Sequence, residues 1–309
     1  MKRLFTKGFI YIGFFIPLFF MVFFISLQKP NYFIYDQYQD EIFEIKKIQL
    51  GIYGDSHIKN AIDTRLIRAK SNRSITHFSS NGVPLFYSIR QIERHLKLNT
   101  QIKVILDLGT NNIENSLYLE GDQYSKVGFL THLSNNYIYL QPSDYHLFFK
   151  NYPVLTLQGI LNGIYQLSTF FNAGINKTTG VLSHSVLNQY DQLKQEHDSV
   201  RSRIAPKFNS NFEIENLKEL VRKHPKTSFL FIRPPEHPLH QSLYGNQTKF
   251  KQLKDYFKSK PNVLFLDYGN KIYADTLFND YSHLNNQGNF LFTNALLESE
   301  DFVSFIEEQ

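Results

Sequence analysis

Short apolar segments alternate with amphipathic segments along most of the chain after residue 46. Five apolar segments combine β-branched and aromatic residues with little charge: "KIQLGIY" (47–53), "SITHFSS" (74–80), "IKVILDLG" (102–109), "TSFLFIRPP" (227–235) and "NVLFLDYG" (262–269). Runs of this length and composition are typical of strands, and the most continuous of them of strands covered on both faces. They predict the five strands of a sheet.

Between these runs, apolar residues recur every three or four positions, which is the spacing of an amphipathic helix. The spacing predicts helices in five segments: 57–69, 84–97, 211–224, 249–260 and 286–309. Pro84 supports the second of them, because proline is favoured at the first position of a helix. Strands that alternate with helices imply a parallel sheet covered by helices. The predicted fold is therefore an α/β/α sandwich with a five-stranded parallel sheet.

The N-terminus carries an uncharged segment of 20 residues, "GFIYIGFFIPLFFMVFFISL" at 8–27. As a helix that rises about 1.5 Å per residue, this segment spans the ~30 Å of a bilayer core. No small-residue cleavage site follows it, so we expect an uncleaved transmembrane signal anchor. Three cationic residues precede the segment and only Lys29 follows at once. This asymmetry predicts a cytoplasmic N-terminus, with the rest of the chain in the periplasm or at the cell surface.

The predicted organisation has three parts. Residues 1–29 form the cytoplasmic tip and the anchor, residues 30–46 form a tether, and residues 47–309 form the α/β domain. The alternation of strands and helices breaks down at about 115–210, where the sequence is first aromatic and then polar. We expect a helical insertion there that packs against the main domain, because aromatic residues mostly serve burial. The bilayer or a partner protein is the alternative contact for its aromatic residues.

Composition excludes several classes of protein. The chain has 309 residues, of which 42% are hydrophobic, so it can bury a full core. Its net charge is +5, but Lys2, Arg3 and Lys7 supply three of these charges, and no basic patch predicts a nucleic-acid partner. The chain has no cysteine, which excludes disulfides and thiolate metal sites.

Polar segments directly follow four of the predicted strands: Gly54-Asp55-Ser56, Ser80-Asn81-Gly82, Gly109-Thr110-Asn111 and Arg233-Pro234-Pro235. In parallel sheets of this kind, ligands bind beyond the carboxyl ends of the strands. The four segments are therefore expected to meet at one edge of the sheet and to form a site there.

The stretch "GDSH" at 54–57 allows two interpretations. Asp55 and His57 could be metal ligands, as at the start of binuclear metallophosphatases, but the further carboxylate, asparagine and histidine motifs of such sites are absent from the sequence. Alternatively, Ser56 is a nucleophile, which requires a base and an orienting acid elsewhere. Asp280 and His283, three residues apart after the last predicted strand, supply that pair. We therefore predict no metal and no cofactor.

The sequence resembles the SGNH (GDSL-type) hydrolases and their acyltransferase relatives. The resemblance rests on "GDSH" at 54–57, "NG" at 81–82, "GTNN" at 109–112 and "DYSHLNNQG" at 280–288, which occur in the order of the family. It implies that Ser56 is the nucleophile, with Asp280 and His283 completing the triad. It also implies that the Ser56 N–H, Gly82 and Asn111 donate to the oxyanion. Asn112 stands where the family often has aspartate.

This resemblance implies a membrane-anchored serine esterase or O-acyltransferase. We expect it to act through an acyl-serine on small acyl esters or on acetylated polysaccharide of the cell envelope, beside a multi-span membrane acyltransferase. The alternative is a non-catalytic envelope assembly or glycan-binding protein, although a binder would not need the whole set of catalytic residues. Arg233 and His237, in "RPPEHP", could bind an anionic or sugar substrate or could be structural.

Overall fold

The computed structural model of the chain describes residues 45–79, 83, 85–109, 113, 143–144, 146, 157, 212–244, 248–271 and 273–307. The chain divides into two compact units, one formed by Ile45–His132 with Lys177–Gln309 and the other by Met1–Glu44 with Leu133–Asn176. The sheet and the candidate site belong to the first unit. Most of the predicted insertion, and the whole predicted anchor and most of the tether, lie outside the described residues.

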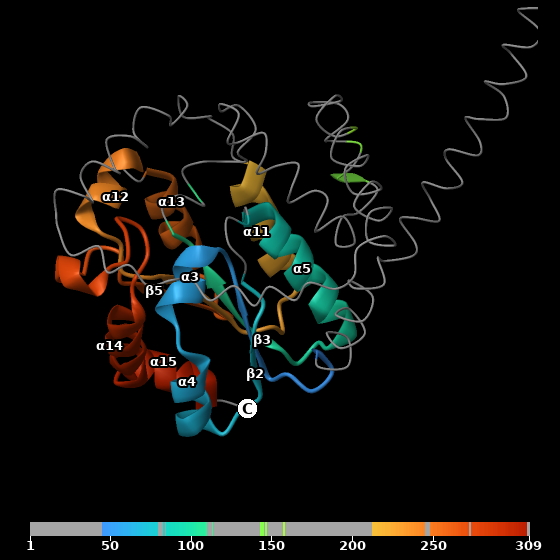
Figure 1. Cartoon of the computed structure of the whole chain (residues 1–309). Coiled ribbons are helices and arrows are strands. Elements are labelled where there is room, and N and C mark those ends of the chain that lie inside the picture. The colour runs from blue at the N-terminus through green and yellow to red at the C-terminus, as the bar shows by residue number, and fades with distance from the viewer. Residues whose placement is uncertain are drawn as a thin grey trace, which may run out of the picture. The chain divides into compact units, whose positions relative to one another are not determined.

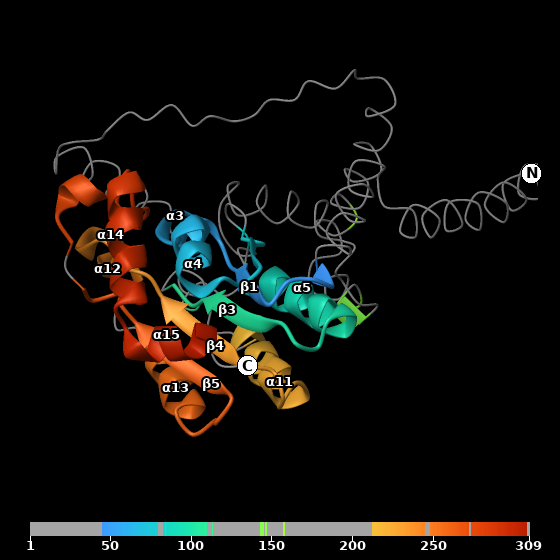
Figure 2. The ribbon, with the colours of Figure 1, turned by 90° about the horizontal axis from the view of Figure 1, so that it is seen from below.

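The sheet has five strands, all parallel, in the order β2-β1-β3-β4-β5 (Figures 1 and 2). They are β1 (Leu50–Tyr53), β2 (Ile75–His77), β3 (Lys103–Asp107), β4 (Phe229–Arg233) and β5 (Val263–Asp267). Each strand lies within one of the five predicted apolar segments, so the prediction of a five-stranded parallel sheet is confirmed. This strand order is that of flavodoxin-like sheets, in which ligands bind beyond β1 and β3, where the direction of winding reverses.

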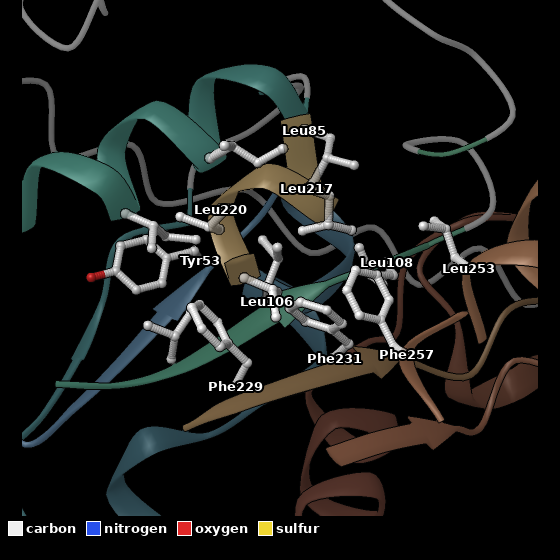
Figure 3. Packing of buried hydrophobic residues seen from close by; sticks show 14 of the residues in the cluster. Tyr53, Leu85, Leu106, Leu108, Leu217, Leu220, Phe229, Phe231, Leu253 and Phe257 are labelled. Carbon is white, nitrogen blue, oxygen red and sulfur yellow. The ribbon is translucent and has the colours of Figure 1, made fainter. Parts of the chain in front are cut away.

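Successive residues of the central strands enter two separate hydrophobic cores. On β3, Val104 and Leu106 join one core and Ile105 joins the other, and β4 divides its residues in the same way. This division follows from the alternation of side chains along a strand. Figure 3 shows part of the first core, with Phe229 and Phe231 packed near Leu106. Burial of each such side chain contributes about 1.5–3 kcal/mol. The polar residues of β3 and β4 stand only at the strand ends, at Lys103, Asp107 and Arg233.

Helices cover both faces of the sheet (Figures 1 and 2). The first core is covered by α5 (Leu85–Leu98), α11 (Phe212–Lys223) and α13 (Thr248–Phe257). The second is covered by α3 (Ser56–Ala61), α4 (Thr64–Ser71), α14 (Asn286–Leu297) and α15 (Glu300–Glu307). The short helices α12 (Pro238–Tyr244) and η2 (Asp275–Leu277, a 3-10 helix) lie in the segments that follow β4 and β5.

Two of the predicted helices are each divided into two. The segment 57–69 is broken at Ile62 and Asp63, where the Asp63 carboxylate accepts a hydrogen bond from the backbone N–H of Arg65 and so begins α4. An aspartate at this position favours a new helix start over continuation of the previous helix. The segment 286–309 is similarly divided between α14 and α15. Helix α12 was not predicted from the sequence.

Among the described residues, no helix combines the length and the hydrophobicity needed to cross a bilayer. Residues 8–27, where the span is predicted, lie outside those residues.

Candidate active site

The site begins at the sharp turn between β1 and α3. Gly54 has a φ of 140°, and a Cβ atom at this position would collide with the Cβ of Asp107 and lie 2.9 Å from Ile58 Cγ2. Only glycine adopts this conformation without strain. The Asp55 carboxylate accepts a hydrogen bond of 2.8 Å from the backbone N–H of His57 and caps α3. Ser56 is therefore held as the first residue of the helix.

Hydrogen bonds tie this helix to α14. Asn60 donates its side-chain amide to the carbonyl of Ser56 at 2.8 Å, and Asn289 of α14 donates to the carbonyl of Asn60, also at 2.8 Å. Thr293, one turn further along α14, accepts from the backbone N–H of Asp63 at 2.9 Å. Because α14 follows the loop that carries Asp280 and His283, these bonds fix the position of Ser56 relative to that loop.

The loop before α14 is closed by its own backbone. Asn279 donates its backbone N–H to the carbonyl of His283 at 2.8 Å, and Asn285 donates to the carbonyl of Leu277 at 2.9 Å. The side chain of Asn285 also accepts from the backbone N–H groups of Gln287 and Gly288 and so begins α14. The loop thus has a defined shape even though it contains no regular structure.

The structure brings Ser56, Asp280 and His283 together as predicted. His283 Nε2 lies 2.6 Å from Ser56 Oγ, and His283 Nδ1 lies 2.7 Å from Asp280 Oδ2. An ionised carboxylate only accepts hydrogen bonds, so the proton of the imidazole resides on Nδ1, and Nε2 accepts from the Ser56 hydroxyl. The side chains of His283 and Asp280 are 23% and 27% exposed, which leaves the group accessible from solvent.

Asp280 is kept ionised by its surroundings. Burial raises its pKa, but hydrogen bonds from His283 and from the backbone N–H and hydroxyl of Ser282, together with the charge of His283, hold the pKa well below its ordinary value. Ser282 donates its hydroxyl to Asp280 Oδ1 at 2.8 Å and its N–H to the same oxygen at 2.7 Å. His283 Nδ1 lies within hydrogen-bond distance of both carboxylate oxygens, 2.7 Å from Oδ2 and 2.9 Å from Oδ1.

Three donors to an oxyanion were predicted from the sequence. As the first residue of α3, Ser56 has a backbone N–H with no acceptor within its own helix, as at any helix start. Gly82 and Asn111 lie outside the described residues, so their roles as donors stay predictions.

Arg233 does not occupy the position expected of a substrate ligand. Its side chain is 1% exposed, and its guanidinium pairs with Glu236 at 2.8 Å and lies over the ring of Phe250. It also passes so close to Gly269 that a Cβ there would collide with it. Of the two predicted roles, the structure favours the structural one, because every face of the guanidinium is covered by the protein.

His237 is also buried. Its Nε2 lies 3.1 Å from Asp275 Oδ1, and its Nδ1 accepts from the backbone N–H of Leu239 at 3.2 Å. Its ring packs edge-on against Phe278. These contacts join the segment after β4 to the segment after β5, and of the two roles predicted for His237 they favour the structural one.

Asp55 and His57 meet a third polar side chain, Asp107, at the end of β3. Ligand-type atoms of the three lie within 4.8 Å of one another, a spacing that a metal ion could use. However, His57 Nδ1 lies 3.0 Å from Asp55 Oδ1, and burial and the charge of Asp55 raise the pKa of Asp107 well above its usual value. Metal ligation requires deprotonated donors. The donor set therefore fits a buried ion pair better than a metal.

We accordingly expect a chelator to leave ester turnover by the full-length protein unchanged, because the proposed nucleophile, base and acid need no ion. The measurement is the rate of hydrolysis of an aryl acetate before and after incubation with EDTA. A loss of activity that Mn²⁺ or Zn²⁺ restores would instead support a metal held by Asp55, His57 and Asp107.

Several polar residues of the site were not predicted from the sequence. His57 was considered as a metal ligand, and in the structure it is buried beside Asp55, which caps α3. Asp107 is a charged residue within the apolar run "IKVILDLG", which was an available signal. Ser282 lies in the loop before α14, and His240 lies in α12, a helix that was not predicted. Neither residue carries a sequence signal that distinguishes it from an ordinary polar residue.

Comparisons with known proteins gave one partial family match and one distant structural match. One protein-family model matches residues 183–301, which is less than half of the chain. A search of curated proteins found no match. Among solved structures, the chain is similar to one from Streptococcus pneumoniae that is provisionally assigned as a platelet activating factor. The two are 11% identical, with a TM-score of 0.43 over 91% of this chain and 98% of the other.

Proposed function

We propose that this protein is a serine-dependent esterase or O-acyltransferase of the SGNH type. The observation that carries the proposal is the arrangement of Ser56, His283 and Asp280, in which a hydroxyl, an imidazole and a carboxylate are joined by hydrogen bonds of 2.6 and 2.7 Å. Serine nucleophiles are recognised by this geometry rather than by their fold. The accessible position of the group beyond the ends of the strands supports the proposal.

In the proposed reaction, Ser56 Oγ attacks the carbonyl carbon of an ester while its proton passes to His283 Nε2. The negative charge moves to the former carbonyl oxygen, and the Ser56 N–H is suited to donate to it. The ester bond then breaks, the leaving alkoxide takes the proton from His283, and an acyl-Ser56 remains. Water, or a sugar hydroxyl in a transferase, gives its proton to His283 and attacks the acyl group. The bond between the acyl group and Ser56 Oγ then breaks, and Ser56 Oγ takes the proton back from His283.

The substrate class and the location extend this proposal. An anchor at residues 8–27 would hold the domain next to the membrane, on the outer side according to the charges that flank the anchor. That position suits acetyl esters of cell-envelope or exported polysaccharide, and it suits a multi-span membrane acyltransferase as a source of acyl groups. Hydrolysis and transfer use the same three side chains and differ in the acceptor.

A serine-directed fluorophosphonate tests the proposal directly. The full-length protein, purified in detergent, should be labelled at Ser56 and at no other serine, because among the described serines only Ser56 bonds to His283 Nε2. Peptide mass spectrometry identifies the labelled residue, and labelling should abolish hydrolysis of an aryl acetate. An unlabelled protein, or a label spread over several serines, would contradict the proposal.

A further inference from the structure

The proposed reaction leaves His57 without a role, although it directly follows the nucleophile. The side chain is 7% exposed, and its Nδ1 lies 3.0 Å from Asp55 Oδ1. Within the described part of the chain, its Nε2 is buried and has no hydrogen-bond partner. A buried polar nitrogen in this state costs free energy. An apolar residue would avoid that cost, so the presence of histidine requires a reason.

The ring of His57 faces the ring of the catalytic base. The centroids of the His57 and His283 rings are 5.0 Å apart, and their planes are inclined by 30°. The hydrogen bonds of His283 to Asp280 and Ser56 hold two points on the edge of its ring. These two bonds still allow the His283 ring to rotate about the line that joins Nδ1 and Nε2. A second ring packed against its face restricts this motion, as stacked aromatic pairs do.

Charged and titratable groups face His57 from the elements packed against it. They are Asp55 at the β1–α3 turn, Asp107 at the end of β3, Glu236 after β4, His240 in α12, and His283 in the loop before α14.

These surroundings favour the imidazolium form of His57. Burial lowers the pKa of His57, but the charge and hydrogen bond of Asp55 and the charges of Asp107 and Glu236 raise it to about 9. Burial and the charge of His57 lower the pKa of His240 to about 3, so His240 is neutral. The positive charge next to Ser56 therefore belongs to His57, and it balances the carboxylate of Asp55.

We propose that His57 is a positioning residue for the catalytic base: held by Asp55 in its protonated form, it provides the surface against which the His283 ring packs. The proposal rests on the proposed function, since it concerns the geometry of His283 as a base. Loss of the proton from His57 leaves the buried carboxylate of Asp55 without a counter-charge. Such a charge is costly in the interior, so the pair reorganises and the packing surface is lost.

The first test is the variant His57→Gln. Its kcat for an aryl acetate at about pH 7 should fall roughly 10-fold with little change in KM, because the base is less well positioned while the substrate contacts remain. In the unsubstituted protein, kcat should also fall as pH rises through about 9, where His57 loses its proton. The variant should lack this alkaline fall, which a purely structural role would not affect.

The variant Asp55→Asn removes the carboxylate charge beside His57 but keeps the ring of His57. Asparagine also caps helices well, so α3 should be retained. Removal of the carboxylate takes away the main influence that raises the pKa of His57. The alkaline fall in kcat should therefore move to lower pH by about one unit or more.

His95→Gln is the matched control. His95 is also buried, and it bonds to the hydroxyl of Tyr53 through Nδ1 on the opposite face of the sheet. Its replacement should lower the Tm but leave both kcat of the folded protein and the alkaline fall in kcat unchanged.

Stability should also depend on the titration of His57. Because the pKa of His57 is raised above its unfolded value of 6.5, the stabilising effect of His57 is complete below that pH and is lost as pH rises through about 9. The resulting decrease in Tm at alkaline pH should be absent from the variant His57→Gln.

An alkaline fall that is the same in all of these variants would overturn the proposal. If the variants do not fold, nuclear magnetic resonance of the unsubstituted protein decides instead. The ring signals of His283 should change as His57 titrates, and independent behaviour of the two rings would overturn the proposal. A protein that lacks esterase activity altogether would contradict the proposed function, whereas this coupling between the two rings would still be measurable.

Discussion

Replacing Ser56 with alanine is expected to lower kcat for an aryl acetate by about 10⁴-fold or more. The reaction proposed here passes through an acyl-serine, and no other described hydroxyl forms a hydrogen bond with His283 Nε2. Water acting in place of the serine would have to be positioned and activated by the remaining groups, which accounts for the small residual rate. The measurement is steady-state turnover by the full-length protein in detergent.

A matched variant, Ser259→Ala, removes an exposed hydroxyl at the end of α13 that bonds only to a local carbonyl in the described structure. It should retain full activity. A thermal melt of Ser56→Ala should show a folded protein with a Tm close to that of the unsubstituted chain. If Ser56→Ala turned over the ester as fast as the Ser259→Ala control, Ser56 could not be the nucleophile.

Replacing Asp280 with asparagine should lower kcat by about 10⁴-fold with a smaller effect on KM. The asparagine amide can place its NH₂ group against His283 Nδ1, which favours the tautomer with the proton on Nε2. In that tautomer, Nε2 cannot accept the proton of Ser56. The overall shape of the site should persist, because Ser282 and the backbone still hold the loop. Steady-state kinetics at about pH 7 measure the effect.

The variant Asp280→Asn should also change how the Tm depends on pH. The pKa of Asp280 is lowered by its partners in the folded state, so its stabilising effect is present above its unfolded value near 3.8 and is lost as pH falls through the folded value. The Tm difference between the unsubstituted protein and Asp280→Asn should therefore be largest near neutral pH and should shrink in strong acid. The control Asp255→Asn, at an exposed position of α13, should leave both kcat and Tm unchanged. Full activity in Asp280→Asn would exclude Asp280 as the orienting acid.

The sheet was predictable from the sequence because its strands are buried on both faces. Runs such as "FLFI" in β4 have no polar face, and their short length and their β-branched and aromatic residues favour a strand over a helix. Helix boundaries were less predictable. The break at Asp63 depends on whether an aspartate within a periodic segment caps a new helix, and tertiary contacts such as the bond from Asp63 to Thr293 decide that choice. Helix α12 is short, and its sequence "PLHQSLY" has little periodicity.

The grouping of Ser56, Asp280 and His283 was predictable because these residues lie in short motifs at the ends of strands. Arg233 and His237 lie near the same edge of the sheet, yet their side chains are directed into the protein. Position relative to a strand does not determine the direction of a side chain, which here depends on Glu236 and Asp275 as partners. The contact between His57 and His283 likewise joins residues far apart in the sequence, and no local pattern reveals it.

The pairing of β3 with β4 has a consequence for folding. Strands β1 to β3 come from residues 50–107, whereas β4 and β5 come from residues 229–267, so Val104 meets Phe229 only when two distant parts of the chain close on each other. Contacts between distant segments form slowly, because the intervening chain loses conformational entropy before these contacts stabilise the folded state. Ser56 belongs to the first part and His283 to the second. We therefore expect the nucleophile to gain its base only at this late step, so that a nascent chain acquires reactivity toward esters only once its sheet is complete.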